Sequence, residues 1–129
     1  MNERHYTPKA SAAATSRQLK GEQEELIACE FLQSKGLQLV EQNFLCRMGE
    51  IDLIMQDKTG LIFVEVRYRK NAQYGGAAAS VTRSKQRKII RTALFYQQKY
   101  YPKSCMRFDV IAIEGDNAPQ WFPSAFDGF

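Results

Sequence analysis

Two short runs separated by a turn signal constrain the fold of this chain more than any other part of its sequence. They span residues 49–54 and 61–67, and each alternates between apolar and polar side chains with the period of two that indicates a β-strand. The Asp-Lys-Thr-Gly stretch at 57–60 has the length and composition of a hairpin turn. The sequence therefore predicts an antiparallel β-hairpin here.

The register of this hairpin brings two carboxylates together. If Gln56 pairs with Leu61, Asp52 lies directly opposite Glu65, and their β-carbons are about 5 Å apart. Like charges that face each other across a strand pair are destabilising, so a cation is expected between or beside them. That cation is either a divalent metal ion or an arginine.

The second strand also offers an arginine explanation. Its two faces separate cleanly, and the same register places Glu50 opposite Arg67. A cross-strand ion pair beside carboxylates neutralised by Arg67 and Arg69 accounts for the pattern as well as a metal site does. The pattern alone leaves both explanations open. The two faces are Ile62, Val64, Val66 and Tyr68 on one side, and Phe63, Glu65, Arg67 and Arg69 on the other.

Five runs stand in a fixed order along the chain: GEIDLI at 49–54, FVEVR at 63–67, Tyr74-Gly75-Gly76, residues 81–85, and RFDV at 107–110. Together they resemble the YraN family, a bacterial group assigned to the PD-(D/E)XK superfamily of restriction-endonuclease-like and Holliday-junction-resolvase-like nucleases. The resemblance covers roughly residues 18–127. It implies a single α/β domain with a mixed central β-sheet flanked by helices, in the order α-β-β-β-α-β.

The resemblance also implies a set of site residues. Asp52 and Glu65 would hold Mg²⁺ or Mn²⁺, the carbonyl of Val66 would be a third ligand, and Glu25 would be the acidic residue of the first helix. Helical geometry does not select Glu25, because Glu24 lies nearer the centre of the apolar stripe of that helix. A solvated glutamate stabilised by the helix dipole is the alternative for Glu25.

The chain departs from the superfamily pattern at two positions. Ile51 replaces a proline, which is a common variation, and Arg67 replaces the motif lysine. Arginine stays charged, so Arg67 can hold the scissile phosphate but is a poor general base. The catalytic set implied by the resemblance is therefore Glu25, Asp52, Glu65 and Arg67. Lys85 could reach the site in place of the missing lysine, although a solvated or phosphate-facing surface lysine is the simpler interpretation.

Charge is segregated along the sequence. Residues 1–66 hold seven Lys/Arg and ten Asp/Glu, whereas residues 67–108 hold eleven Lys/Arg and no acid. A basic half beside a carboxylate cluster predicts a nucleic-acid partner, and the resemblance makes that partner DNA. The alternative is a positive surface that only keeps the protein soluble.

A second helix lies in the basic half, with Ser80 or Thr82 as its N-cap. Its apolar stripe is expected to comprise Ile89, Ile90, Ala93, Leu94 and Tyr96. Lys85, Lys88 and Arg91 recur at helical spacing and predict a basic ridge, after a small, flexible Gly-Gly loop. The predicted nucleic-acid contacts are Arg69, Lys70, Arg83, Lys85, Lys88 and Arg91.

The remaining segments supply a scaffold. Residues 1–17 predict a flexible tail and 18–129 an endonuclease-like domain, with a helix at 18–34 ended by Gly36 and strands at 37–44 and 106–113. No segment reaches membrane-spanning length. Three widely spaced cysteines predict reduced thiols in a cytoplasmic protein. The only histidine, in the tail, argues against a zinc site, and a homodimer is compatible with the sequence.

Two functions follow from these observations. The first is a metal-dependent DNA endonuclease that hydrolyses phosphodiester bonds, of branched or single-stranded DNA for example. The second is a nucleic-acid-binding module of the same fold with weak or no catalysis. Position 67 discriminates between them: arginine weakens the case for an enzyme, but the retained acidic pair still favours it. A third interpretation is an interaction protein whose acidic cluster is purely structural.

Overall fold

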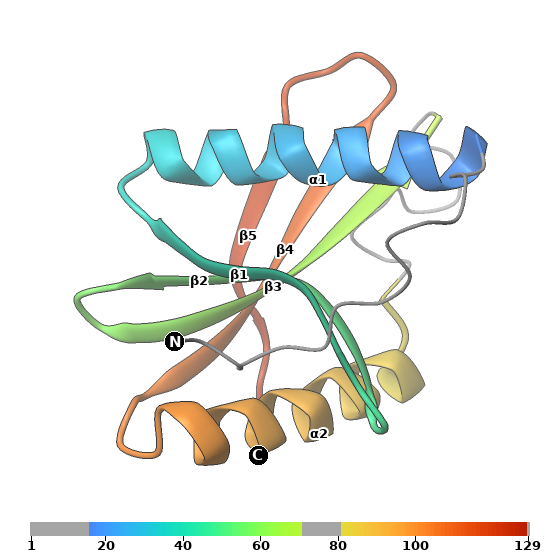
Figure 1. The fold of residues 1–129 in the computed structure, drawn as a ribbon. Coiled ribbons are helices and arrows are strands. Elements are labelled where there is room, and N and C mark those ends of the chain that lie inside the picture. The colour runs from blue at the N-terminus through green and yellow to red at the C-terminus, as the bar shows by residue number, and fades with distance from the viewer. Residues whose placement is uncertain (1–15, 71–80, 129) are drawn as a thin grey trace.

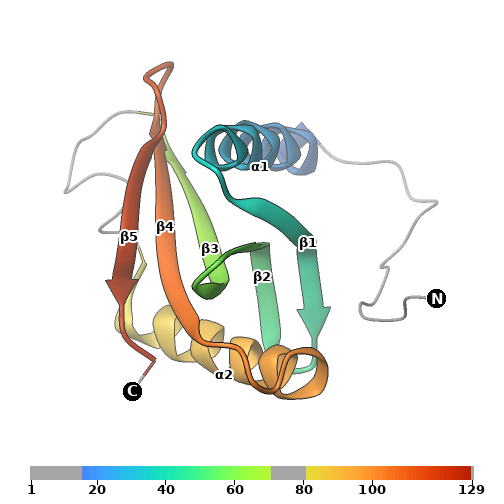
Figure 2. The ribbon, with the colours of Figure 1, turned by 90° about the vertical axis from the view of Figure 1, so that its left-hand side faces the viewer.

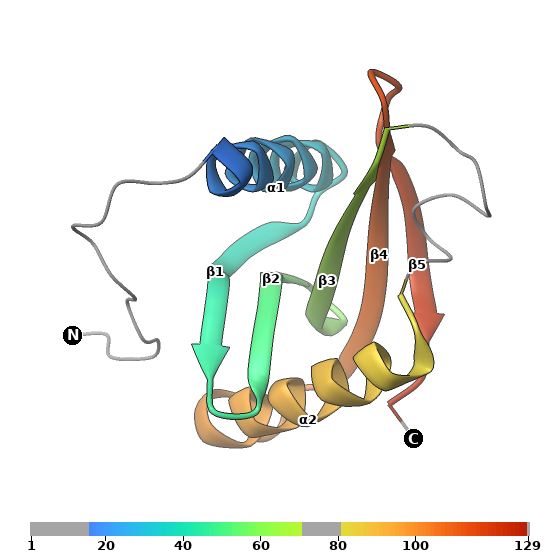
Figure 3. The same cartoon turned by 90° about the vertical axis from the view of Figure 1, so that its right-hand side faces the viewer.

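The computed structural model describes residues 16–70 and 81–128. A five-stranded mixed sheet in the order β1-β2-β3-β4-β5 lies between two helices (Figure 1). Figure 2 and Figure 3 show α1 against one face of the sheet and α2 against the other. The elements are α1 (Ser16–Ser34), β1 (Gln38–Cys46), β2 (Gly49–Asp57), β3 (Gly60–Arg69), α2 (Arg83–Tyr100), β4 (Met106–Glu114) and β5 (Gln120–Phe126).

This arrangement confirms the predicted α/β fold class. Neighbouring strands are antiparallel except β3 and β4, which are parallel because α2 crosses from the end of one to the start of the other. No helix in the described ranges is long and apolar enough to cross a membrane. The three cysteines are free thiols. Most of the predicted tail, the Tyr74-Gly75-Gly76 run and Ser80 lie outside the described residues.

The end of α1 follows the predicted glycine signal. Gly36 has φ +98°. The amide of Gly36 donates to the Gln33 carbonyl and that of Leu37 to the Leu32 carbonyl, at 3.0 and 3.1 Å. These two bonds make a Schellman motif, in which glycine is favoured because it adopts the left-handed conformation without steric cost. The helix begins at Ser16, two residues before the predicted start.

The predicted hairpin is present with the predicted register. Gln56 pairs with Leu61 and Asp57 with Gly60, so the turn itself has two residues. Asp57 Oδ1 accepts a hydrogen bond from the Thr59 amide at 2.8 Å. Gly60 has φ +139°, and a β-carbon there would lie 2.6 Å from the carbonyl oxygen of Cys105. Glycine at this position therefore lets the turn pack closely on the segment that precedes β4.

Both faces of the sheet are covered by apolar cores, as the alternation in β3 predicts. Ile62 and Val64 pack in the cluster under α1, and Phe63 packs in the cluster under α2. Burial of such side chains contributes about 1.5–3 kcal/mol each. Ile89, Ala93 and Tyr96 of α2 are buried as predicted, whereas Ile90 and Leu94 are half-buried. Thr92 is buried instead, because its hydroxyl is satisfied by donating to the Lys88 carbonyl.

Strands β1 and β2 bend near Asn43 and Asp52. Ile51 and Ile54 pack in the same cluster, although strict alternation puts residues three apart on opposite faces. On β1, Asn43 has φ +54° and falls opposite Asp52, between the pairs Gln42–Leu53 and Phe44–Ile51. Asparagine tolerates this left-handed conformation better than most residues. The bend turns the lower half of the β1–β2 hairpin away from β3 (Figure 3).

The tip of the β1–β2 hairpin rests on α2. Gly49 has φ +150°, and a β-carbon there would lie 2.9 Å from Thr92 Oγ1 and 3.9 Å from the Lys88 carbonyl oxygen. The absence of a side chain thus allows the hairpin backbone to sit directly against the helix.

The Trp121-Phe122 run belongs to β5, a strand that the predicted element order lacks. Pro123 lies inside this strand. The side chains of β5 are all exposed or half-buried, so the strand shows little alternation between buried and exposed positions. The buried carboxylate of Asp109 links β4 to β5. It accepts hydrogen bonds from Arg107 Nε at 2.9 Å and Nη2 at 3.0 Å, Trp121 Nε1 at 2.8 Å and the Ser124 amide at 2.9 Å.

Candidate functional site

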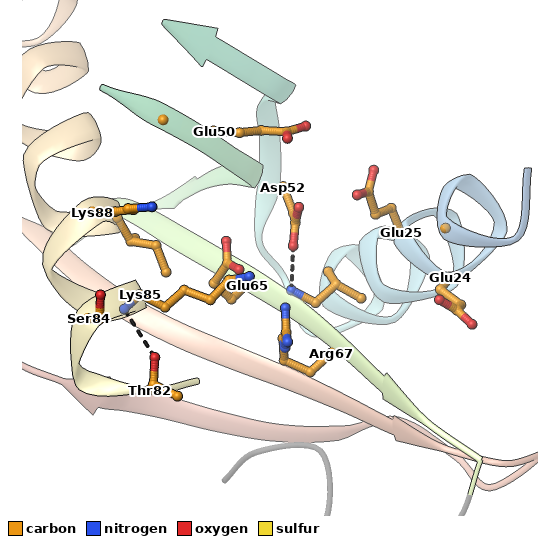
Figure 4. Close-up of a pocket in the computed structure, with 14 residues that line it drawn as sticks. Glu24, Glu25, Glu50, Asp52, Glu65, Arg67, Thr82, Ser84, Lys85 and Lys88 are labelled. Atoms are coloured by element: carbon orange, nitrogen blue, oxygen red, sulfur yellow. Dashed lines mark hydrogen bonds between the residues drawn. The ribbon is translucent and has the colours of Figure 1, made fainter. Parts of the chain in front are cut away.

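A cavity of about 500 Å³ opens between α1 and α2, at the point where β2 and β3 separate (Figure 4). We call it the carboxylate pocket. A continuous sheet would keep side chains of α1 apart from those of α2, because the helices cover opposite faces. The opening between the strands lets both helices contribute to one pocket. The residues that matter for its chemistry are Glu25, Glu50, Asp52, Glu65, Val66, Arg67, Lys85 and Lys88.

Asp52 and Glu65 meet in this pocket, but not as a paired position of the ladder. The β2–β3 pairing ends at Leu53–Val64, one residue before them. The predicted register therefore holds, but Asp52 and Glu65 lie just beyond the last pair of the ladder. Asp52 Oδ2 accepts a hydrogen bond from the Val66 amide at 2.9 Å, so a side chain takes the place of the next backbone partner. Repulsion between the two carboxylates favours this separation.

The opening also exposes a backbone oxygen. In a β-strand, the amide and the carbonyl of one residue point to the same neighbouring strand. The Val66 amide points to Asp52, so the Val66 carbonyl points toward the same opening. This is the oxygen that the resemblance implies as a third metal ligand. The predicted Glu50–Arg67 pairing is not part of the ladder either, since both residues lie beyond its last pair.

Glu25 reaches the pocket from α1. Figure 4 shows its carboxyl group on the side of the helix that faces Asp52, whereas Glu24, which also lines the pocket, points away from Asp52. The side chains of Asp52 and Asn43 lie near enough to Glu25 to perturb its carboxyl group. Burial, and then the charge of Asp52, raise the pKa of Glu25 to about 8. The carboxyl of Glu25 is thus mostly protonated at neutral pH when no cation is bound nearby.

The other two acids are perturbed in the same direction. Glu65 is buried, and burial followed by the charge of Asp52 raises its pKa well above the usual value. Desolvation also raises the pKa of Asp52, while the hydrogen bond from the Val66 amide and then the nearby Glu25 side chain oppose that shift. Three carboxyl groups therefore share one poorly solvated space, and added positive charge would stabilise their ionised forms.

Some positive charge is already supplied by the protein. Thr82 caps α2 through its Oγ1, which accepts from the Lys85 amide at 3.2 Å, and this fixes where the helix begins. Lys85 is exposed, as the simpler interpretation held, yet its ammonium group extends beside Glu65 (Figure 4). The positive charges of Arg67 and Lys85 both oppose the upward pKa shifts of Asp52 and Glu65. Lys85 and Arg67 therefore both place positive charge at these two acids.

Four other predicted basic residues, unlike Lys88, lie away from this pocket. Arg69 and Lys70 are exposed at the end of β3, where Arg69 Nη1 donates to the Tyr68 carbonyl at 2.8 Å. Arg83 and Arg91 line a separate depression on α2. The predicted ridge of Lys85, Lys88 and Arg91 therefore runs from the carboxylate pocket to this second depression.

Two contributors were absent from the sequence interpretation. Asn43 lowers the pKa of the nearby Glu25 carboxyl group, and Arg87 lines the second depression with Arg83 and Arg91. The spacing of the three arginines, four residues apart, is a signal that could have found Arg87. No local pattern marks Asn43, because its role depends on the packing of α1 over β1.

The donor set of the carboxylate pocket suits a hard divalent cation. Its accessible donors are carboxylate and carbonyl oxygens, which Mg²⁺ and Mn²⁺ prefer. Within residues 16–70 and 81–128, no three His, Cys, Asp or Glu side chains already form a metal-binding group. A cation here would therefore keep several water ligands, as Mg²⁺ commonly does in proteins.

Comparison with known proteins places this chain in a bacterial group. It is similar to UPF0102 proteins of Psychromonas ingrahamii (46% identical, 92% of this chain and 96% of the relative) and Aeromonas hydrophila (51%, 83% and 84%). A UPF0102 protein of Legionella pneumophila is 48% identical over 85% of this chain and 96% of its own length. The model of the uncharacterised protein family UPF0102 matches residues 24–113. The chain therefore belongs to the UPF0102 family.

Proposed function

We propose that this protein is a metal-dependent endonuclease of the PD-(D/E)XK type, which hydrolyses phosphodiester bonds in DNA. One observation carries the proposal. The strands that bear Asp52 and Glu65 separate to open a pocket, and this pocket holds clustered carboxyl groups beside Arg67 and Lys85. Acidic side chains that need a cation and basic side chains that can bind phosphate are the two requirements of such a reaction.

The metal would be held by the carboxylates of Asp52 and Glu65 and the carbonyl of Val66. When bound, Mg²⁺ or Mn²⁺ supplies positive charge near the phosphate and lowers the pKa of a coordinated water. The fit rests on the oxygen donor set and on the raised pKa values of both acids, which a cation would reverse.

The side chains around these acids have separate tasks. Arg67 holds a non-bridging phosphate oxygen, which its guanidinium can do with two hydrogen bonds. Lys85, beside Glu65, neutralises charge that develops on the phosphate and orients the attacking water. Glu25 lies beside Asp52, and its raised pKa suits it to take up or release a proton near neutral pH.

A DNA-binding module without catalysis is the second candidate. It is favoured by the arginine at position 67, which cannot lose its proton as the motif lysine can. Lys85 weighs against it, because its ammonium group lies beside Glu65 and can replace that lysine (Figure 4). The two candidates differ in whether DNA is cut, and not in whether it is bound.

A cleavage assay tests the proposal directly. Duplex, branched and single-stranded DNA are incubated with the wild-type protein, Asp52→Asn and the control Asp116→Asn, which changes an exposed turn aspartate. Cleavage in Mg²⁺ or Mn²⁺ by wild type and control, with at least a 100-fold loss in Asp52→Asn, is expected. Equal cleavage by all three would identify a contaminant or another site. Binding without cleavage by the wild type would select the second candidate.

Metal binding is tested separately by calorimetry or by Mn²⁺ relaxation. The wild-type protein should bind Mn²⁺ weakly, and both Asp52→Asn and Glu65→Gln should abolish binding. If each variant binds Mn²⁺ as well as the wild type, the carboxyl cluster is structural and the endonuclease proposal fails.

A further inference from the structure

The first half of α2 carries two separate basic surfaces. Lys85 and Lys88 line the carboxylate pocket. Arg83, Arg87 and Arg91 line a second depression, of about 350 Å³, together with the C-terminal residues Asp127 and Gly128. We call the three arginines the arginine face. Residues two apart on a helix are about 160° apart around its axis, so Arg83 and Arg87 lie nearly opposite Lys85.

These two surfaces are joined across the exposed side of the helix. The sequence of steps Lys85, Lys88, Arg91, Arg87, Arg83 moves three or four residues each time, so each side chain neighbours the next. All five residues are exposed. The segment Arg83–Tyr100 contains no acidic residue. A band of positive charge therefore passes from the carboxylate pocket, around the outside of α2, to the second depression.

The width of this band matches one ligand. An α-helix with its side chains is about 10–12 Å across, and the major groove of B-form DNA is about 12 Å wide and accepts a helix. A helix in that groove has a phosphate backbone along each side. Arginine is well suited to one of these backbones, because its guanidinium binds phosphate with two hydrogen bonds.

We propose that the first half of α2 lies in the major groove of duplex DNA. One backbone meets Lys85 and Lys88 and enters the carboxylate pocket, and the opposite backbone meets the arginine face. This inference rests on the proposed function and adds its substrate class, a double-stranded DNA segment. Single-stranded DNA would contact one side of the helix only. Duplex RNA would fit poorly, because its major groove is too narrow for side chains to enter.

Fluorescence anisotropy with 20-base-pair DNA tests this placement, in EDTA and in Ca²⁺, and at several salt concentrations. The variants are Arg83→Gln, Arg87→Gln and Arg91→Gln. The control is Lys103→Gln, which removes an exposed charge from the loop between α2 and β4. Each arginine variant should bind duplex DNA several-fold more weakly than the control. The slope of log K against log salt should become shallower by about 0.9 for each phosphate that the variant no longer neutralises.

Two further measurements sharpen the test. Asp127→Asn removes the carboxylate beside the arginine face, so duplex affinity should rise and the melting temperature should stay unchanged. Single-stranded DNA and duplex RNA of the same sequence should bind the arginine variants and the control equally well. The inference is overturned if the arginine variants match the control on duplex DNA, or bind all three nucleic acids more weakly to the same degree.

The outcome also separates this inference from the proposal on which it rests. A wild-type protein that binds no DNA in either buffer overturns both. A wild-type protein that binds and cleaves DNA while the arginine variants behave as the control overturns only the placement of α2.

Discussion

Asp109 and the Asp52–Glu65 pair place acidic groups at two junctions of the same sheet, with opposite surroundings. Asp109, between β4 and β5, receives hydrogen bonds from Arg107, Trp121 and the Ser124 amide. Asp52 and Glu65, between β2 and β3, face each other and Glu25 across a pocket. At the first junction, hydrogen-bond donors from β4 and β5 satisfy the acid. At the second, repulsion between the acids favours separation of the strands. Burial alone therefore does not mark an acid as a candidate site residue, whereas neighbouring acids that raise its pKa do.

The largest predicted effect is a loss of stability when the acid of the β4–β5 junction is replaced by its amide. Asp109→Asn should lower the free energy of unfolding by about 3 kcal/mol, because the new amide group turns a donor toward donors that are already in place. Urea unfolding measures this, with Asp116→Asn as a control that should change stability by less than about 0.5 kcal/mol. A decrease of less than about 1 kcal/mol for Asp109→Asn would mean that the junction does not depend on its charge.

The pH dependence of stability should report the ionisation of Glu25 at the β2–β3 junction. The folded protein holds the Glu25 proton up to about pH 8, whereas the unfolded chain releases it near 4.5, so more protons are bound in the folded state between these values. Stability of the metal-free protein should therefore fall as the pH rises from about 5 to 8. Glu25→Gln should flatten this profile in thermal melts. A profile that rises over the same range would contradict the protonated state of Glu25.

Added Mg²⁺ should reverse that decrease in stability. At 100 times the dissociation constant, a ligand that binds only the folded state stabilises it by about 2.7 kcal/mol. The effect should be larger at pH 8 than at pH 5.5, because the pocket acids must be ionised to bind the cation. Melting temperatures with and without Mg²⁺ measure it. The effect should disappear in Glu65→Gln and remain in Lys103→Gln.

Asp52→Asn should have the opposite sign to Asp109→Asn. Removal of the charge next to Glu25 and Glu65 relieves repulsion, and the amide oxygen can still accept from Val66. We expect the metal-free protein at pH 8 to gain about 1 kcal/mol of stability. Urea unfolding in EDTA gives the value. A destabilisation as large as that of Asp109→Asn would show that both junctions are structural.

The smallest expected effect is that of Arg67→Lys. If the protein is an endonuclease, cleavage should rise by less than about tenfold, or about 1.4 kcal/mol of barrier, since Lys85 already places an ammonium group nearby. Unchanged absence of cleavage with weaker DNA binding would favour the binding module. A decrease in stability alone, of up to about 1 kcal/mol, would assign Arg67 to an ion pair.

The two junctions also differ in how far sequence predicts them. The β2–β3 turn and its register follow from local signals, and so does the end of α1 at Gly36. The β4–β5 junction does not, because β5 is an edge strand with Pro123 inside it and few buried side chains. Alternation also cannot locate where the β2–β3 ladder ends. That end depends on charge balance across the pocket and on the bend at Asn43, which only the packed structure brings together.

Gly49 gives the open junction a mechanical property. Because the hairpin backbone rests on Thr92, contact with α2 sets how closely the β1–β2 hairpin approaches the basic side chains of that helix. Asp52 lies on this hairpin, three residues from Gly49, whereas Glu65 lies on the neighbouring strand. The distance between the two acids therefore depends on the absence of a side chain at Gly49. A bulkier residue at position 49 would wedge the hairpin outward and widen the gap that a cation has to span, without altering any group that touches it.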